Sequence, residues 1–238
     1  MTSRAESVAV VWRRELGSYF HGPVAYSVGV LFTGVAAALF FSVFFLYGRA
    51  ELRRFFELLP ILYGIAIPVL ALRQVGAERQ NGMYEVLSTL PTRSTDILLG
   101  KYLALWTTAV VILLPTVVFG VIVLFLGPLD IGAAAAGYIG AVLLGGALSG
   151  VALMAATFTR SIAVSFGIGL LLSVMLASLE AFAPLLPPAL GRVVSQLSTA
   201  FHMGDFGRGI IDLRSIVYFV SVAAISLAIA RHTIRARR

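Results

Sequence analysis

Residues 24–47 read VAYSVGVLFTGVAAALFFSVFFLY, a run of 24 residues without a charged side chain. The hydrocarbon core of a bilayer is about 30 Å thick, and a helix needs about 20 apolar residues to cross it. Pro23 stands just before the run, where the first turn of a helix tolerates proline. Because the run has no polar face, it is not the pattern of a helix on the surface of a soluble domain. It predicts a membrane-spanning helix.

Five further apolar stretches are long enough to span a membrane, at about residues 55–72, 102–126, 131–158, 162–182 and 216–230. The first of these contains Pro60 and Pro68, which predict a kink or a break in that helix. We therefore predict an all-α integral membrane protein with six transmembrane helices, forming a single domain over residues 1–238. In the fourth predicted span, Gly146 and Gly150 have the small-xxx-small spacing of close helix packing, and packing within the chain is the favoured use.

The composition agrees with a membrane protein. Hydrophobic residues make up 59% of the chain and charged residues 12%, with a mean hydropathy of +0.96, whereas soluble domains are about 45–50% apolar and about 25% charged. The net charge of +7 does not indicate nucleic acid, because the arginines stand at the ends of apolar segments rather than in one patch. The absence of cysteine excludes disulfides, thiolate zinc sites and iron–sulfur clusters.

The distribution of basic residues predicts the orientation. With the N-terminus inside, the inner segments hold twelve of the 18 Lys and Arg and five of the 11 acids, and the outer segments hold six of each. The inner side therefore carries the whole net charge of +7. We predict that both termini are cytoplasmic.

Residues 5–20 have the periodicity of an amphipathic helix. One predicted face holds apolar and aromatic side chains and the other holds polar ones: Val8, Val11, Trp12, Leu16, Tyr19 and Phe20 against Arg13, Arg14, Gly17 and Ser18. We predict a helix in the cytoplasmic membrane interface, and the alternative is a soluble lead-in to the first span.

Two long loops carry helical patterns of their own. In the cytoplasmic loop at 74–100, an apolar face formed by Met83, Val86, Leu87 and Leu90 ends at Pro91. Such a helix either docks in a groove of a soluble partner or packs on the bilayer surface. In the outer loop at 184–214, Leu190, Val193, Val194 and Leu197 follow Pro187-Pro188 at helical spacing, which predicts a re-entrant or surface helix.

The sequence contains no recognisable enzyme site. His21, His202 and His232 are far apart and fall near predicted membrane boundaries, where an interfacial role is favoured over metal binding. The spans are nearly free of charge, with Glu180 near the end of the fifth, which disfavours an ion-coupled carrier. The chain also lacks a GxxxxGK[ST] phosphate loop, so any ATPase has to be a separate subunit. We therefore predict a non-catalytic chain with no metal or cofactor of its own.

Three stretches resemble the ABC-2 type permeases. The cytoplasmic loop has the family's charged and leucine-proline pattern at Glu78, Arg79, Gly82, Glu85, Leu87, Leu90 and Pro91. The opening, Trp12-Arg13-Arg14-Glu15-Leu16 with Tyr19-Phe20 and Pro23-Val24-Ala25-Tyr26, is similar to that of the gliding-motility-associated branch. The stretch before the last span is also similar to that branch at His202, Phe206, Arg208, Gly209, Ile211, Asp212 and Tyr218-Phe219. Ala77, Met83 and Gly22 depart from the pattern.

The resemblance implies an ABC-2, or type V exporter-like, fold in a bacterial inner membrane. It implies that residues 5–20, with Trp12, Arg13, Arg14 and Glu15, form an interfacial connecting helix. It also implies a coupling helix from Glu78 to Leu90, and an outer segment at 187–212, with His202, Arg208, Gly209 and Asp212, that dips back into the membrane.

The partners implied by the resemblance are an ATP-binding cassette subunit that binds ATP and Mg²⁺, a second permease subunit, identical or related, and a periplasmic auxiliary subunit. The pathway would lie between the two membrane subunits. Two other functions stay open from the residues alone: a structural scaffold of a motility or envelope assembly, and an ion-coupled secondary carrier.

Overall fold

The computed structural model describes residues 4–47, 51–80, 94–159 and 161–236, in which the regular elements are all helices and no strand occurs. The elements are α1 (Arg4–Phe20), α2 (Pro23–Tyr47), α3 (Arg53–Gln80), α5 (Ser94–Leu113), the 3₁₀ turn η1 (Leu114–Thr116), α6 (Val117–Leu126), α7 (Ile131–Phe158), α8 (Ile162–Phe182), the 3₁₀ turn η2 (Ala183–Leu185), α9 (Pro188–Gln196), α10 (Thr199–Gly207) and α11 (Leu213–Ala236).

Six segments in the described part of the chain are long and apolar enough to cross a membrane. They are Pro23–Phe44, Arg53–Leu72, Thr95–Leu126, Ile131–Phe158, Ile162–Leu185 and Leu213–Ala236. The prediction of an all-α, multi-pass membrane protein is thus confirmed, and each predicted span corresponds to one of these segments.

Several boundaries differ from the predicted ones. The helix α3 runs without a break through Pro60 and Pro68 and continues to Gln80, and α5 begins at Ser94. Both ends of the predicted loop at 74–100 are therefore helical, over residues 74–80 and 94–100. The third predicted span is not one uninterrupted α-helix, because Pro115 lies in the 3₁₀ turn that separates α5 from α6. The last helix is longer at both ends than the predicted span at 216–230.

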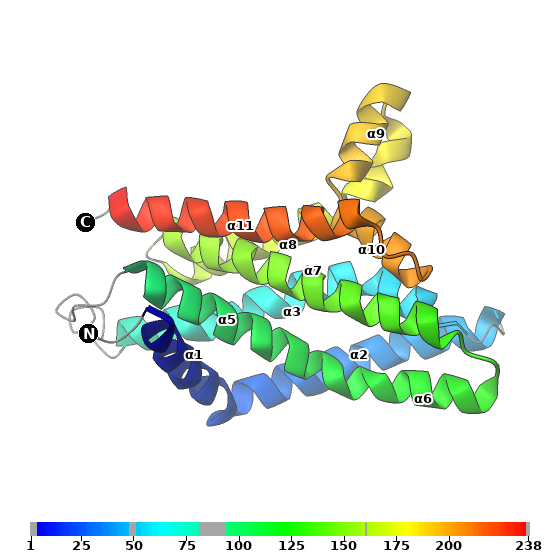
Figure 1. Ribbon diagram of the computed structural model, residues 1–238, viewed down its shortest axis with the longest axis horizontal. Coiled ribbons are helices and arrows are strands. Elements are labelled where there is room, and N and C mark those ends of the chain that lie inside the picture. The colour runs from blue at the N-terminus through cyan, green and yellow to red at the C-terminus, as the bar shows by residue number, and fades with distance from the viewer. Residues whose placement is uncertain (1–3, 48–50, 81–93, 160, 237–238) are drawn as a thin grey trace.

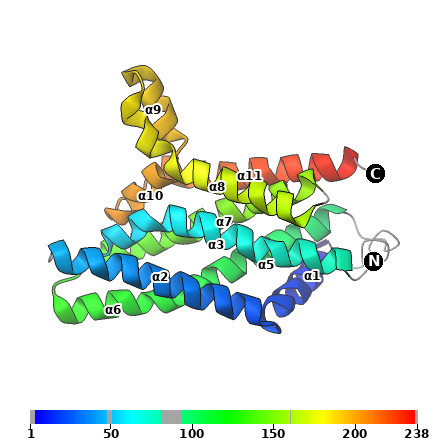
Figure 2. The same ribbon diagram turned by 180° about the vertical axis from the view of Figure 1, so that it is seen from behind.

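The spans run side by side along the long axis of the molecule (Figure 1). Both ends of the chain lie at one end of this bundle, where α3 also ends and α5 begins, and the view from behind agrees (Figure 2). We refer to this end as the terminus end and to the other as the far end. The end of α2, the start of α3 and the link from α6 to α7 lie at the far end.

The centre of the bundle is formed by α7 and α3. Within their most apolar windows, 72% and 67% of the residues are buried, against 17–39% in the other four spans. Glycines bring neighbouring helices close to α7: Gly146 faces Tyr102 and Trp106 of α5, and Gly150 faces Ala223 and Ser226 of α11. The predicted use of these two glycines in packing within the chain is confirmed.

Candidate functional site

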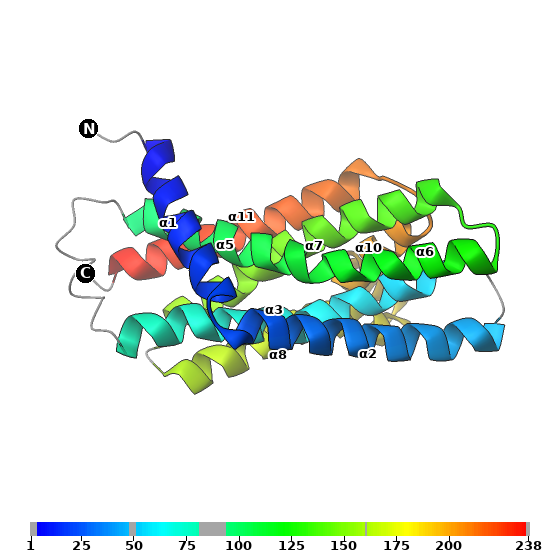
Figure 3. The same ribbon diagram turned by 90° about the horizontal axis from the view of Figure 1, so that it is seen from below.

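At the terminus end, α1 lies across α5 rather than parallel to the spans (Figure 3). The two helices meet at Gly100, where an added Cβ would lie 2.6 Å from Cγ1 of Val11 and 3.1 Å from the carbonyl oxygen of Val8. Only glycine lets α1 approach the backbone of α5 this closely. The amphipathic helix predicted over residues 5–20 is therefore packed on the bundle.

Two hydrogen bonds fix α1 to the helices on either side of residues 81–93. The indole N–H of Trp12 donates to Oγ1 of Thr107 in α5 at 3.2 Å. The hydroxyl of Tyr19, which is fully buried, donates to the carbonyl oxygen of Leu70 in α3 at 3.2 Å. A third bond, from Nε2 of Gln74 to the carbonyl oxygen of Lys101 at 3.0 Å, joins α3 directly to α5.

The charged side chains of α1 divide between the surface and the interior. Arg13 is exposed, whereas Glu15 is buried and accepts a 2.8 Å bond from the partly exposed guanidinium of Arg14. Asp96 and Lys101 of α5 are buried at the same end, so the buried Asp, Glu and Lys side chains in the described part of the chain gather here. Burying a charge without a partner is costly, and the pairing with Arg14 offsets that cost for Glu15.

The residues proposed for the coupling helix are only partly within the described structure. Glu78 and Arg79 belong to the last turns of α3 instead of starting a separate helix. Gly82, Glu85, Leu87 and Leu90 lie outside the described residues. Their flanking helices α3 and α5 are the two helices to which α1 is bonded.

At the far end, His202 of α10 is buried and uses both ring nitrogens. Its Nε2 lies 3.0 Å from the carbonyl oxygen of Gln196, and its Nδ1 lies 2.9 Å from Oγ of Ser215 in α11. Because a carbonyl oxygen can only accept, we infer that Nε2 donates to Gln196, while the Ser215 hydroxyl lies within reach of both Nδ1 and Oδ2 of Asp205, the latter at 3.5 Å. His202 therefore joins α10 to α11 and to the end of α9, and neither nitrogen is free for a metal ion.

The ring of Tyr218 completes this contact. It stacks on the His202 ring with centroids 4.1 Å apart, and its hydroxyl donates to the carbonyl oxygen of Leu197 at 2.6 Å. In the described part of the chain, no group of three or more His, Asp or Glu side chains could hold a metal ion. The cluster around His202 is thus a structural junction between the outer segment and the last span.

The three other predicted residues of the outer segment have separate roles. Gly209 has φ of +85°, and an added Cβ would lie 3.1 Å from Cα of Ala133, so the turn requires glycine. Asp212 caps α11, because its carboxylate accepts from the backbone N–H of Arg214 at 2.9 Å. The side chain of Arg208 is exposed. The structure therefore does not bring these residues into one site with His202.

The outer segment forms two short helices in place of the single predicted one. The helix α10 packs against the bundle, while α9 stands out from its side (Figures 1 and 2). Exposed apolar side chains cover α9 and the turn before it, among them Leu185, Leu190, Val193 and Leu197. A helix after Pro187-Pro188 is confirmed, and its apolar residues are uncovered by the rest of the chain.

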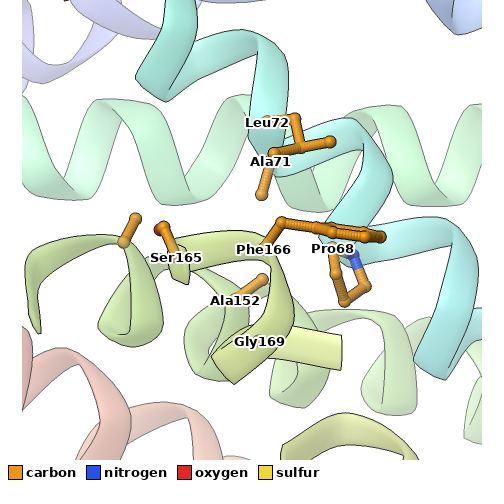
Figure 4. Close-up of a pocket in the computed structure, with 8 residues that line it drawn as sticks. Pro68, Ala71, Leu72, Ala152, Ser165, Phe166 and Gly169 are labelled. Atoms are coloured by element: carbon orange, nitrogen blue, oxygen red, sulfur yellow. The ribbon is translucent and has the colours of Figure 1, made fainter. Parts of the chain in front are cut away.

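A small cavity lies where α3, α7 and α8 meet (Figure 4). Its walls include Pro68, Ala71, Ala152, Phe166 and Gly169, and its volume is only about 10 Å³. A void of this size holds no more than about one water molecule. It is not a site for a transported molecule.

Sequence reasoning missed the partners that fix these elements. Gly100 carries a weak signal, since an isolated glycine at the start of an apolar helix indicates a close approach. Thr107 and Ser215 carry none, because a single hydroxyl in an apolar span has no pattern of its own.

Comparison with known proteins does not identify a family. No protein-family model matches the chain, and no curated protein matches it at a significant level. The residues and their geometry therefore carry any functional conclusion.

Proposed function

We propose that this chain is the membrane subunit of an ATP-driven transporter of the ABC-2 type, which works with separate ATP-binding subunits and a second membrane subunit. The proposal rests on the hydrogen bonds that join α1 to both helices flanking residues 81–93. Trp12 donates to Thr107 of α5, and Tyr19 donates to the carbonyl oxygen of Leu70 in α3. A force applied to residues 81–93 reaches α3 and α5 first, and these bonds transmit it to α1 as well.

The chain itself offers no source of energy for transport. The charged side chains of the six candidate spans stand near the ends of those spans, and the sequence has no phosphate-binding loop. ATP hydrolysis in a partner is consistent with both features. The partner would bind at residues 81–93, with Glu78, Arg79 and Glu85 supplying polar contacts and Leu87 and Leu90 an apolar face.

The transport pathway is proposed to lie between two membrane subunits. The α3–α7–α8 cavity is too small for a cargo, and the centre of the bundle is filled by α7, whose glycines hold its neighbours in close contact. ATP-driven closure of the partner subunits would then shift two packed bundles relative to each other, as rigid bodies.

The test is co-purification of the tagged chain, from membranes of its own host, with an ATP-binding cassette subunit identified by mass spectrometry. We expect Glu85→Lys and a deletion of residues 80–88 to abolish recovery of the ATPase without loss of membrane insertion. Glu51→Lys is the matched control, because Glu51 is exposed at the far end of the bundle. Undiminished recovery with the two loop variants would contradict this docking site, and absence of any ATPase with the unaltered chain would contradict the function.

A further inference from the structure

An open depression of about 550 Å³ lies between the first half of α1 and the side of α5. Its walls are apolar side chains: Ala5, Val8, Ala9 and Trp12 from α1, and Leu103 from α5. None of the residues that line the depression belongs to the His202 junction. Its apolar walls do not suit a polar solute.

The contacts of α1 show which way this depression faces. Val8 and Val11 meet α5 at Gly100, whereas Trp12 bonds to Thr107, seven residues further along the helix. At 1.5 Å per residue, Thr107 lies about 10 Å deeper along α5 than Gly100. The side of α1 that carries Trp12 therefore faces the interior of the membrane, where acyl chains are found.

A positive charge stands at the edge of the depression. Arg13 is exposed, follows Trp12 directly, and is four residues from Ala9, which places it on the same flank of α1. The neighbouring Arg14 is instead paired with Glu15. An amphipathic helix of this kind lies at the boundary between headgroups and acyl chains, so Arg13 is at the level of lipid phosphates.

We propose that this depression binds one acyl chain of an anionic phospholipid, whose phosphate pairs with Arg13. The apolar walls suit the chain, and the guanidinium suits the phosphate at the depth where the helix lies. The lipid would fill the space beneath α1 and hold that helix against α5. This proposal does not depend on the function proposed above.

The test uses the purified full-length chain in nanodiscs that contain equal amounts of phosphatidylglycerol and phosphatidylcholine, and native mass spectrometry counts the lipids retained after release. We expect one retained phosphatidylglycerol per chain. Ala9→Trp, which fills the depression, should abolish retention. Val10→Trp is the matched control, because Val10 is the adjacent residue and is 67% exposed on the other side of α1. Arg13→Gln should lower the preference for phosphatidylglycerol about fivefold, the effect of one arginine near an anionic surface.

Leu103→Trp fills the depression from the α5 wall and is the variant to test if Ala9→Trp fails to fold. The proposal is overturned if the filled variants retain lipid as the unaltered chain does, or if that chain retains both lipids equally. It is also overturned if the filled variants change only the oligomeric state, since the depression would then belong to a second copy of the chain.

Discussion

Two glycines of α7 lie where any side chain would collide with a buried aromatic ring. An added Cβ at Gly140 would lie 2.5 Å from Cγ of Phe206, and one at Gly137 would lie 2.1 Å from Cε2 of Phe56. Both phenylalanines are essentially fully buried, so neither ring has free space into which to move. The rings of α3 and α10 thus occupy the places where α7 has no side chain.

We predict that Gly140→Ala destabilises the protein. Alanine favours helix by up to about 1 kcal/mol over glycine, but overpacking a filled core costs about 1–3 kcal/mol, so the net effect should be a lower free energy of unfolding. The measurement is the thermal unfolding midpoint in detergent. Gly167→Ala in α8 is the control, because an added Cβ there meets nothing within 4 Å. A midpoint for Gly140→Ala as high as that of the control would show that Phe206 can move aside.

The lengths of the helices show what the sequence could and could not predict. The bounds of α7 agree with the predicted span because Asp130, whose carboxylate accepts from the N–H of Ala133, caps it directly before the apolar run. By contrast, the predicted end of the second span at Leu72 was too early, because α3 continues to Gln80. Hydropathy measures only the part of a helix that suits lipid, and the backbone stays helical beyond it. The 3₁₀ turn at Pro115 was missed because hydropathy does not register a change of helix type within an apolar stretch.

The contacts between elements were harder to predict from the sequence than the elements themselves. The amphipathic pattern predicted α1, but its bond from Trp12 to Thr107 joins residues 95 positions apart. The predicted importance of His202 came from a resemblance, and its actual partners, Ser215 and the carbonyl oxygen of Gln196, depend on how α9, α10 and α11 meet. Such pairings arise from the tertiary arrangement and leave no periodic signal in one sequence.

The projecting helix α9 leads to a prediction about its environment. If the apolar side chains of α9 are embedded in lipid, a thiol in place of Val193 should react slowly with a water-soluble maleimide, because a thiol ionises poorly away from water. A thiol in place of the adjacent Arg192 should react several-fold faster, although both positions are exposed in the single chain. The chain has no cysteine, so labelling of Val193→Cys and Arg192→Cys in membrane vesicles reports on these positions alone. Equal rates would place the apolar face of α9 in water or against another protein chain.

At the scale of the whole molecule, the arrangement of the spans is compatible with the predicted orientation. Both ends of the chain and the flanks of residues 81–93 lie at one end of the bundle, as an even number of spans requires. The described parts of the predicted inner segments lie at this end; those segments carry the net charge of +7, and basic residues are retained on the cytoplasmic side during insertion. The terminus end should therefore face the cytoplasm.

A single thiol at each end of the bundle tests this orientation. His232 near the end of α11 and Glu51 before α3 are both exposed, so His232→Cys and Glu51→Cys should fold normally and react equally well in detergent. In intact cells, a membrane-impermeant maleimide should label Glu51→Cys and leave His232→Cys unlabelled, and disrupting the cells should expose the second thiol. The reverse pattern would place α1, with Arg13 and its lipid depression, in the outer leaflet. It would also remove residues 81–93 from any cytoplasmic ATPase, so that the energy source proposed for this protein would no longer be able to reach it.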